Sequence, residues 1–502
     1  PRTLGKDEKK KQATVDAIAK TFGVASSVVE EVIQKKPNSM YEHIDGLKEL
    51  PAKKVDKFKK QIKKERLEGV WFEEVYKRNY PLKTVGASII GFMNSNNQGT
   101  YGVEEQYNSV LNGTTGREYG YFDSNMNLQR TIKEAKDGNS VVLTIDANVQ
   151  KIIEDEIADF QKNGPGAKTI AMMVMNPKNG EILAMASNST FDLNDPQNLA
   201  SMYSEQKIAA MTDKEKNENL LSMWSNFCVG SAYEPGSTFK IITAAAALEE
   251  GVVKLDDAFF CPGYKIVEDR RIRCARTTGH GAETFETGIM NSCNPVFMEL
   301  GERLGAENFV GYFKQFGLLS KTNIDLPGEA GTIMHKTENI GPVELATISF
   351  GQSFQITPIQ LVTTVSSIIN GGTRVTPHFG VSVQDADGNT VKTFSYETHE
   401  NICTAETSET MRYLLEKVVS EGTGKNAKIE GFSIGGKTAT SQTLPRSDHK
   451  YISSFLGFAP ADNPQVLVLV VINNPQGIYY GGTIAAPVAK EIFENILPYL
   501  DK

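Results

Sequence analysis

Two strongly apolar segments, far apart in the chain, constrain the fold more than any other feature of this sequence. The first, "TIAMMVMNPKNGEILAMAS" (169–187), contains two apolar strands about a Lys-Asn-Gly turn. The second, "YISSFLGFAPADNPQVLVLVVI" (451–472), repeats that pattern near the other end of the chain. Helices are predicted beside both segments, over 148–162 with Asp146 as N-cap and over 485–500. We therefore predict an α+β fold: an antiparallel sheet flanked by N- and C-terminal helices, with a helical lobe inserted between its strands.

Length and charge limit the classes of protein to consider. With 502 residues, the chain is expected to form two or more domains. A net charge of -8 gives no overall field that would recruit nucleic acid. The longest aliphatic run, 466–472, is far shorter than the roughly 20 residues that span a bilayer. The chain begins at Pro1 without a methionine or a signal peptide, so we interpret it as trimmed, which leaves a lost N-terminal membrane anchor open.

The region before the first apolar segment differs from the rest of the chain in composition and predicted secondary structure. Residues 1–67 are predicted to be helical, because Val55, Phe58 and Ile62 recur at helical spacing among lysines. Those lysines could form a basic binding patch, but a solvated helix face is the favoured interpretation. Residues 68–140 are rich in Gly, Asn and Tyr and are predicted to be a small α+β module. The chain thus divides into an N-terminal module, 1–140, and a main domain, 141–502, in which the polar segment 191–220 is a surface excursion.

The stretch "GFSIGGKTAT" (431–440) fits two motifs that predict different proteins. It satisfies G-x-x-x-x-G-K-[ST], a phosphate loop of nucleotide hydrolases, and it also contains a Lys-Thr-small triplet typical of serine acyltransferases. A phosphate loop must open a helix, because the helix N-terminus holds the anion. Here "SQTLPRSDHKY" follows, and Pro445 and the polar run start no helix. The context therefore favours the acyltransferase motif.

Two further motifs complete an acyltransferase set. "YEPGSTFK" places Ser237 just ahead of an alanine-rich helix, with Lys240 one helical turn away. A buried lysine of lowered pKa can take the proton of such a serine nucleophile, and the helix start offers N–H groups to an oxyanion. "MNSCNPVF" adds Ser292 and Asn294, with Pro295 suited to open the next helix. Each motif is weak alone, but their order and separation match the set of penicillin-binding proteins and class A β-lactamases.

From about residue 70 onward the chain resembles class B penicillin-binding proteins, the D,D-transpeptidases of peptidoglycan synthesis. The family has strings similar to "YEPGSTFK", "SCNPVF", "IDLPGE", "SFGQSFQITPIQL" and "GGTIAAPVAKEI", and "YGVEEQYNSVLNGTTG" is similar to its N-terminal pedestal. The resemblance is greatest to the division and sporulation enzymes. It implies peptidoglycan stem peptides as substrates, trapping by β-lactams, glycosyltransferase and other membrane partners, and a place on the extracytoplasmic face of a bacterial cell membrane.

The resemblance also assigns roles to residues. Ser237 would form an acyl-enzyme with the penultimate D-Ala, Lys240 would be its base, and Asn294 would hold the acyl-side amide. Ser292 would relay a proton while hydrogen-bonded between Lys240 and Lys437. The substrate carboxylate would be recognised from one strand, by Lys437, Thr438 and Thr440, and backbone N–H groups of Ser237 and Thr440 would form the oxyanion hole. The family usually has glycine where this chain has Ala439, so we expect narrower acceptor or inhibitor tolerance.

Three of the five cysteines form a metal-binding pattern with a histidine. Cys261, Cys274, His280 and Cys293 give C-x12-C-x5-H-x12-C, a ligand set that suits a closed, structural zinc site. A Cys261–Cys274 disulfide and buried free thiols are the alternatives, and zinc is favoured because the segment is turn-rich and poor in core residues. Cys293 would then tie the Ser292–Asn294 segment to the metal. Cys228 and Cys403 are predicted to be buried or incidental. For His449, just past the strand of Lys437, an exposed loop is favoured over a place in the cleft.

Other functions remain open alternatives. A β-lactamase or β-lactam sensor would share Ser237 and Lys240, but it would not need about 140 preceding residues, and no water-activating base is identifiable. A catalytically silent scaffold protein could keep the fold while binding envelope proteins, although the intact Ser237, Lys240, Ser292 and Lys437 argue against it. A Ser-His-Asp hydrolase is disfavoured, because its G-x-S-x-G elbow must lead into a helix, whereas the string "GFSIG" (431–435) is followed by a stretch that starts no helix.

Overall fold

The computed structural model describes residues 1–502 except 45, 74–76, 123–127 and 501–502. The chain forms two compact units: an N-terminal unit, Pro1–Asn79, and a main unit, Tyr80–Lys502. Among the described residues, no helix has both the length and the apolar character needed to cross a bilayer.

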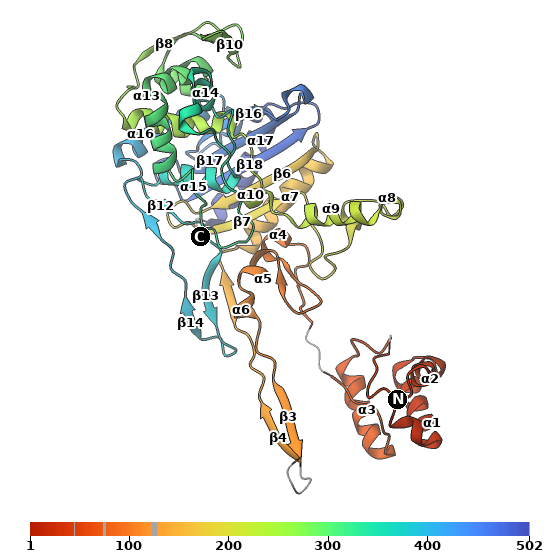
Figure 1. Cartoon of the computed structure of the whole chain (residues 1–502). Helices are drawn as coiled ribbons and strands as arrows, with labels where there is room; N and C mark the ends of the chain where they lie inside the picture. The colour runs from red at the N-terminus through yellow and green to blue at the C-terminus, as the bar shows by residue number, and fades with distance from the viewer. Residues whose placement is uncertain (45, 74–76, 123–127, 501–502) are drawn as a thin grey trace. The chain divides into compact units, whose positions relative to one another are not determined.

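A five-stranded antiparallel sheet forms the centre of the main unit. Its order is β16-β17-β18-β6-β7, with bounds β16 Gly435–Gln442, β17 Tyr451–Ala459, β18 Val466–Pro475, β6 Ala167–Met175 and β7 Ile182–Ser187. Strands from the two ends of this unit therefore lie side by side, blue beside yellow in Figure 1. Both predicted apolar hairpins are confirmed, since β6 pairs with β7 and β17 with β18.

Both faces of this sheet are buried, which explains the unbroken apolar run in β18. Its side chains alternate between two cores: Val468, Val470 and Ile472 face one, while Leu467 and Leu469 face the other. Side chains of a strand alternate between the two faces of its sheet. A strand that is covered on both faces therefore needs apolar residues at every position.

Two helices cover one face of the sheet. These are α7 (Ala147–Lys162) and α17 (Gly481–Leu500), and they share a core that includes Ile153 and Phe493, both fully buried. The predicted N-cap is confirmed, because the carboxylate of Asp146 accepts hydrogen bonds from the N–H groups of Asn148 and Val149. Such a cap contributes about 1 kcal/mol to the helix.

A helical lobe covers the other face and is inserted between β7 and β16, as predicted. Its longer members are α11 Lys240–Glu249, α12 Phe285–Met290, α13 Asn294–Gln315, α14 Pro342–Ile348, α15 Pro358–Ile369 and α16 Ala405–Ser420. Every residue of α15 is buried, and so are eight of the ten in α11. A helix that is buried all round lies at the centre of its domain, so the nucleophile segment ahead of α11 is anchored in the core.

Smaller elements complete the lobe. Two-stranded sheets pair β8 Ala258–Cys261 with β11 Gly281–Thr284, and β9 Tyr264–Val267 with β10 Arg270–Arg273. Another pairs β12 Arg374–Val375 with β15 Thr398–His399, while β5 Ser140–Leu143, β13 Gly380–Gln384 and β14 Thr390–Thr393 form a three-stranded sheet. The excursion 191–220 is an arm with α8 Glu205–Ala210 and α9 Asp213–Trp224 (Figure 1). It is less solvated than predicted, because Phe191, Leu199 and Met223 form a small core with Tyr80 and Phe92.

The described residues between 80 and 139 form short elements and the antiparallel pair β3 and β4. Their bounds are α4 Ala87–Ile90, β1 Phe92–Met93, β2 Gly99–Thr100, α5 Gly102–Gln106, α6 Asn108–Leu111, β3 Arg117–Phe122 and β4 Leu128–Lys133. Asp325, from the "IDLPGE" string, ties this part to the lobe. Its buried carboxylate accepts hydrogen bonds from the hydroxyls of Tyr107 and Tyr396 and from the N–H groups of Phe379 and Gly380.

The described residues of the N-terminal unit include three α-helices, in line with the predicted helical character. They are α1 Glu8–Phe22, α2 Ser26–Lys35 and α3 Ala52–Glu65. Phe58 of α3 is fully buried in a small core with Val15 and Ile18 of α1 and Val29 of α2.

Candidate active site

Ser237 lies on a one-turn 3-10 helix, Gly236–Phe239, that leads directly into α11. Gly236 and Gly351 fix the position of this turn. The N–H of Gly236 donates to the carbonyl of Gly351 at 2.8 Å, and a Cβ at Gly351 would lie 1.9 Å from the carbonyl oxygen of Gly236. Gly351 also has a φ of +91°, which side chains disfavour. The glycine of "SFGQSF" therefore permits the close approach that holds the serine turn against the lobe.

Lys240 is the first residue of α11, and its side chain is fully buried. Its Nζ donates hydrogen bonds to the carbonyl of Ser292 at 2.7 Å, to Ser292 Oγ at 3.1 Å and to Asn294 Oδ1 at 2.7 Å. Loss of hydration lowers its pKa to about 8, although Cys274, Cys293 and Glu283 partly oppose the shift by favouring a cation. A lysine of this pKa is a base near neutral pH.

Ser292 and Asn294 stand at the turn between α12 and α13, where Cys293 is the N-cap of α13 and Pro295 follows in the first turn, as predicted. Ser292 has a φ of +54°, a left-handed conformation that is unfavourable for serine and is held by its surroundings. The Nδ2 of Asn294 donates to the carbonyl of Arg273 at 3.1 Å. The turn thus presents three acceptors to Lys240 while it is fastened to the β10 segment.

Lys437 lies on β16 and is also fully buried. Burial, and next the charge of Lys240, hold the pKa of Lys437 well below its usual value, so the two amines are close enough to repel each other. The Nζ of Lys437 donates to the carbonyl of Thr438 at 3.1 Å. The expected hydrogen bond between Lys437 and Ser292 is not present among the described residues, so Ser292 contacts Lys240 alone. That expectation is wrong for this structure, because Lys437 finds its acceptor on its own strand.

The serine turn packs against the same strand. A Cβ on Gly236 would lie 3.0 Å from the Cβ of Ser441 and 3.6 Å from the Cβ of Ala439. Ser441 Oγ donates to the carbonyl of Glu234 at 3.0 Å. Ser237 is half-buried, and within the described part of the chain its hydroxyl makes no hydrogen bond. Ligand-free enzymes often hold catalytic groups slightly apart in this way.

The strand residues flanking Lys437 are held from both sides. Thr438 Oγ1 donates to Thr423 Oγ1 at 3.4 Å, and Thr440 Oγ1 accepts from the N–H of Gly481 at 3.0 Å. Ala439 is only 3% exposed, and its methyl is directed to Gly236. We expected this methyl to project into the path of the ligand. In the structure it instead packs against Gly236, whose missing side chain leaves room for it.

An ion pair between Glu234 and Arg446 lies next to the serine turn and was not predicted from the sequence. Glu234, 5% exposed, accepts two hydrogen bonds of 3.1 Å from Arg446 Nη2 and one of 2.9 Å from the N–H of Ser353. It therefore joins the serine turn, the "SFGQSF" segment and the loop after β16. Glu234 stands inside the "YEPGSTFK" motif, but no pattern in the sequence marks Arg446 as its partner.

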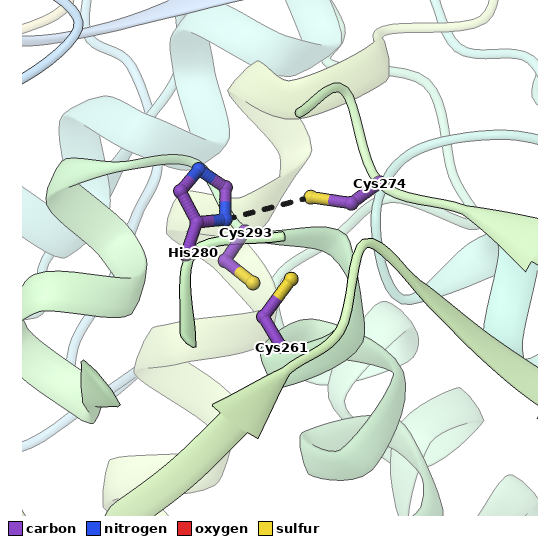
Figure 2. Close-up of side chains that lie close together, drawn as sticks. All are labelled: Cys261, Cys274, His280 and Cys293. Atoms are coloured by element: carbon purple, nitrogen blue, oxygen red, sulfur yellow. Dashed lines mark hydrogen bonds between the residues drawn. The ribbon is translucent and has the colours of Figure 1, made fainter. Parts of the chain in front are cut away.

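The four predicted metal ligands converge (Figure 2). Sulfur or ring nitrogen atoms of Cys261, Cys274, His280 and Cys293 all lie within 4.8 Å of one another, and Cys274 Sγ is 3.7 Å from His280 Nδ1. Local structure explains the convergence. Pairing of β8 with β11 sets Cys261 opposite Gly281, next to His280, and the N–H of Cys274 donates to the carbonyl of Gly263 at 2.9 Å. Cys293 arrives from the N-cap of α13.

The cluster has the character of a thiolate site. All five cysteines of the chain are buried free thiols, so the alternative Cys261–Cys274 disulfide does not form here, and Cys228 and Cys403 are buried as predicted. A hydrogen bond from Cys293 lowers the pKa of Cys274 to about 5 and raises that of Cys293. Glu283, 6% exposed, has one carboxylate oxygen without a hydrogen-bond partner, 3.9 Å from His280 Nδ1. His449, by contrast, is exposed in its loop, as predicted.

Comparison with known sequences identifies the family. The penicillin binding protein transpeptidase domain matches residues 170–494, and the penicillin-binding protein dimerisation domain matches 2–143. Stage V sporulation protein D of Bacillus subtilis is 42% identical, over 88% of this chain and 67% of that protein. Penicillin-binding protein PbpB of Mycobacterium tuberculosis is 29% identical, over 84% of this chain and 61% of that protein.

Solved structures agree with the sequence matches. Penicillin binding protein 3 of M. tuberculosis, in a complex with ampicillin, has a TM-score of 0.71 at 26% identity and covers 85% of this chain and 90% of that chain. Penicillin Binding Protein 2X of Streptococcus thermophilus has a TM-score of 0.80 at 22% identity, covers 98% and 73%, and supports the fold alone. With the serine, lysine and Lys-Thr motifs gathered on the fold that these proteins share, the chain belongs to the penicillin-binding proteins, the D,D-transpeptidases of peptidoglycan synthesis.

Proposed function

We propose that Ser237 of this chain forms an acyl-enzyme with a peptidoglycan stem peptide and passes the acyl group to an amine of a neighbouring stem. The observation that carries the assignment is the buried Lys240, whose pKa is lowered to about 8 and whose Nζ is held by Ser292 and Asn294. A solvated lysine in a chance S-x-x-K motif would show neither feature.

The acylation step follows from these positions. Neutral Lys240 takes the proton of Ser237 as its Oγ attacks the carbonyl carbon of the penultimate D-Ala. As the tetrahedral intermediate collapses, the C–N bond breaks and the proton passes through the hydroxyl of Ser292 to the departing D-Ala amine. N–H groups of Ser237 and Thr440 would hold the oxyanion, each contributing on the order of a hundredfold in rate.

Deacylation reverses the roles with a different amine. The acceptor amine attacks the ester carbonyl and loses a proton to Lys240. As the ester C–O bond breaks, Lys240 returns that proton to Ser237 Oγ, and the new amide is released. Asn294 would orient the acyl-side amide, while Lys437, Thr438 and Thr440 would bind the substrate carboxylate. A β-lactam would stop after acylation, because its ring nitrogen stays tethered and blocks the acceptor.

Mass spectrometry after incubation with a penicillin tests the assignment. We expect one adduct of the full penicillin mass on the peptide that contains Ser237, and none in Ser237→Ala. Ser222→Ala, which changes an exposed serine on α9, is the matched control and should keep the adduct. An adduct elsewhere, or none, would remove the proposal. A chromogenic cephalosporin separates the alternatives: continuous turnover indicates a β-lactamase, and a single stoichiometric burst indicates a transpeptidase.

We also propose a structural zinc ion at Cys261, Cys274, His280 and Cys293. Three thiols and an imidazole within 4.8 Å fit the closed tetrahedral set that zinc prefers, and the lowered pKa of Cys274 favours a thiolate. When bound, the ion would neutralise the thiolates and crosslink the segment. The chain's own residues would do the rest: Cys293 would hold Ser292 and Asn294 in register with Lys240.

Elemental analysis of the purified protein tests the metal. We expect about one zinc per chain, lost in Cys261→Ser and retained in Cys228→Ser, a buried cysteine outside the cluster. Penicillin acylation should slow by about 10- to 100-fold without zinc. Absence of zinc, together with acylation that is indifferent to a chelator, would overturn this assignment.

The wider biological setting is also proposed. Identity of 42% to Stage V sporulation protein D supports a sporulation role over division. From the family resemblance we also propose a complex with a glycosyltransferase and other membrane proteins. We place the chain on the extracytoplasmic face of a bacterial membrane, held by an N-terminal anchor. The matches at 2–143 and 170–494 support a boundary between pedestal and transpeptidase domain near residue 140.

A further inference from the structure

Helix α3 of the N-terminal unit is strongly basic. Its fourteen residues include seven lysines and only two acidic residues, Asp56 and Glu65. All seven lysines are exposed: Lys53, Lys54, Lys57, Lys59, Lys60, Lys63 and Lys64. The chain as a whole carries a net charge of -8, so the positive charge of this helix is opposite in sign to the charge of the chain and does not follow from its overall composition.

These lysines lack an ion-pair partner in the part of the chain that the structure describes. In the described residues, none of the seven makes an ion pair or a hydrogen bond. Lysines of α1 and α2 behave differently, because Lys10, Lys11 and Lys35 each lie within 3.1 Å of a glutamate oxygen. Unpaired like charges one turn apart repel and destabilise a helix slightly. Ion pairing within the described part of the unit therefore does not account for their number.

Helical geometry arranges four of them in a row. Lys53, Lys57, Lys60 and Lys64 are spaced by three or four residues and form a stripe about 16 Å long. The stripe lies opposite Phe58, which is fully buried and fastens the inner face of α3 to the core of the unit. The stripe is thus an outward-facing surface on a helix whose orientation within the unit is fixed.

The shape of the surface favours an extended anionic partner. Ammonium groups on long flexible stems act as point charges and suit many separate phosphates, whereas a single bound ligand would need convergent groups in a cavity. Trp71 and Tyr41 are 57% and 56% exposed, with ring centroids 6.3 Å apart. Trp71, Tyr41 and Lys59 line one cavity, so amphipathic rings border the basic helix. Exposed aromatic rings beside lysines are typical of surfaces that lie on a lipid headgroup layer.

We propose that α3 docks the N-terminal unit onto the surface of an anionic phospholipid bilayer, with its lysines on headgroup phosphates. Docking in the cell rests on the membrane location proposed above, whereas binding of the purified chain to anionic vesicles does not depend on it. Each lysine near such a surface strengthens binding by about fivefold, so the four-lysine stripe supplies roughly 600-fold. Salt should weaken the binding, because ions screen charges at a solvated surface.

Sedimentation of the full chain with vesicles tests the proposal. The probes are vesicles of phosphatidylcholine alone and of phosphatidylcholine mixed with phosphatidylglycerol. We expect binding to the mixed vesicles only, reversed by salt. The variant with Lys53→Gln, Lys57→Gln, Lys60→Gln and Lys64→Gln should lose roughly 600-fold in partition coefficient. Glutamine forms helices as well as lysine does, so the helix is preserved.

A matched variant controls for net charge. It removes four exposed lysines elsewhere in the same unit: Lys6→Gln, Lys9→Gln, Lys20→Gln and Lys35→Gln. We expect this variant to keep most of the binding, and both variants to acylate with penicillin as the parent does. Equal losses in both variants, or no binding of the parent to mixed vesicles, would overturn the proposal. Tight binding to a soluble anionic wall polymer but not to vesicles would overturn the choice of lipid.

Discussion

The protonation of Lys240 sets the pH dependence of acylation. Its pKa is lowered from 10.5 to about 8, chiefly because the ammonium group loses its hydration in the core. At pH 7 about a tenth of the molecules then hold a neutral amine, roughly 300-fold more than for an ordinary lysine. At pH 9 about nine tenths do. The second-order rate constant for acylation by a penicillin should therefore rise about tenfold from pH 7 to pH 9 and level off above.

The same shift affects stability with a defined sign. Between about pH 8 and pH 10.5 the unfolded chain binds more protons at Lys240 than the folded chain does. The contribution of this group to the free energy of unfolding therefore increases with pH across that window. Below about pH 8, both states are protonated, and the buried ammonium destabilises the fold by about 3 kcal/mol.

Time courses with a fluorescent penicillin, quenched and resolved on gels, measure the acylation constant across this pH range. Thermal unfolding at each pH monitors the fold. Lys240→Arg is the sharpest variant, because arginine keeps the positive charge but cannot act as a base. It should acylate at least a hundredfold more slowly at every pH. A flat profile in the parent chain, or a midpoint near 10.5, would refute the assignment of Lys240 as the base.

Three further substitutions test how the site is held together. Arg446→Met leaves the buried carboxylate of Glu234 unpaired, so we expect a loss of about 1–3 kcal/mol in thermal unfolding and about tenfold slower acylation; a parent-like rate would remove the positioning role of the pair. Ala439→Gly should leave acylation nearly unchanged in the penicillin time course, because the methyl lies against Gly236, and a large gain in rate would show that it obstructs ligands. Asp325→Asn places an amide against four donors and should cost about 1–3 kcal/mol in a denaturant titration; an unchanged midpoint would contradict the anchoring role.

The sheet could be predicted from the sequence because its signals are local. The apolar runs at 169–175 and 466–472 exceed what a half-exposed strand needs, which indicates strands covered on both faces. Turn residues and Asp146 then set the boundaries. The excursion after β7 was less predictable, because its small core joins residues as far apart as Tyr80 and Met223. Contacts of that kind leave no periodic mark on either segment.

The candidate active site could not be predicted from the spacing of its residues in the sequence alone. The separation of Ser237, Ser292 and Lys437 along the chain gives no distance in space, and it was the resemblance to a family that predicted their convergence. The pairing of Glu234 with Arg446, 212 residues apart, was missed because a lone glutamate and a lone arginine are common everywhere. The cysteine cluster could be predicted without a relative, since thiols and an imidazole are rare and have few uses together.

Cys293 connects that cluster to the catalytic groups through the backbone, because it stands between Ser292 and Asn294 in the chain. Its sulfur lies in the cluster, while its two neighbours supply all three acceptors that Lys240 Nζ reaches. Ser292 keeps an unfavourable backbone conformation there, and such strain persists only where both sides of a residue are anchored. On the N-terminal side, the N–H of Asn291 donates to the carbonyl of Thr287 at 2.9 Å. On the C-terminal side, the N–H of Cys293 donates to the carbonyl of Gly288 at 2.8 Å, and the sulfur of Cys293 lies in the cluster. Loosening the cluster should therefore change the position of the base's partners before it unfolds anything else.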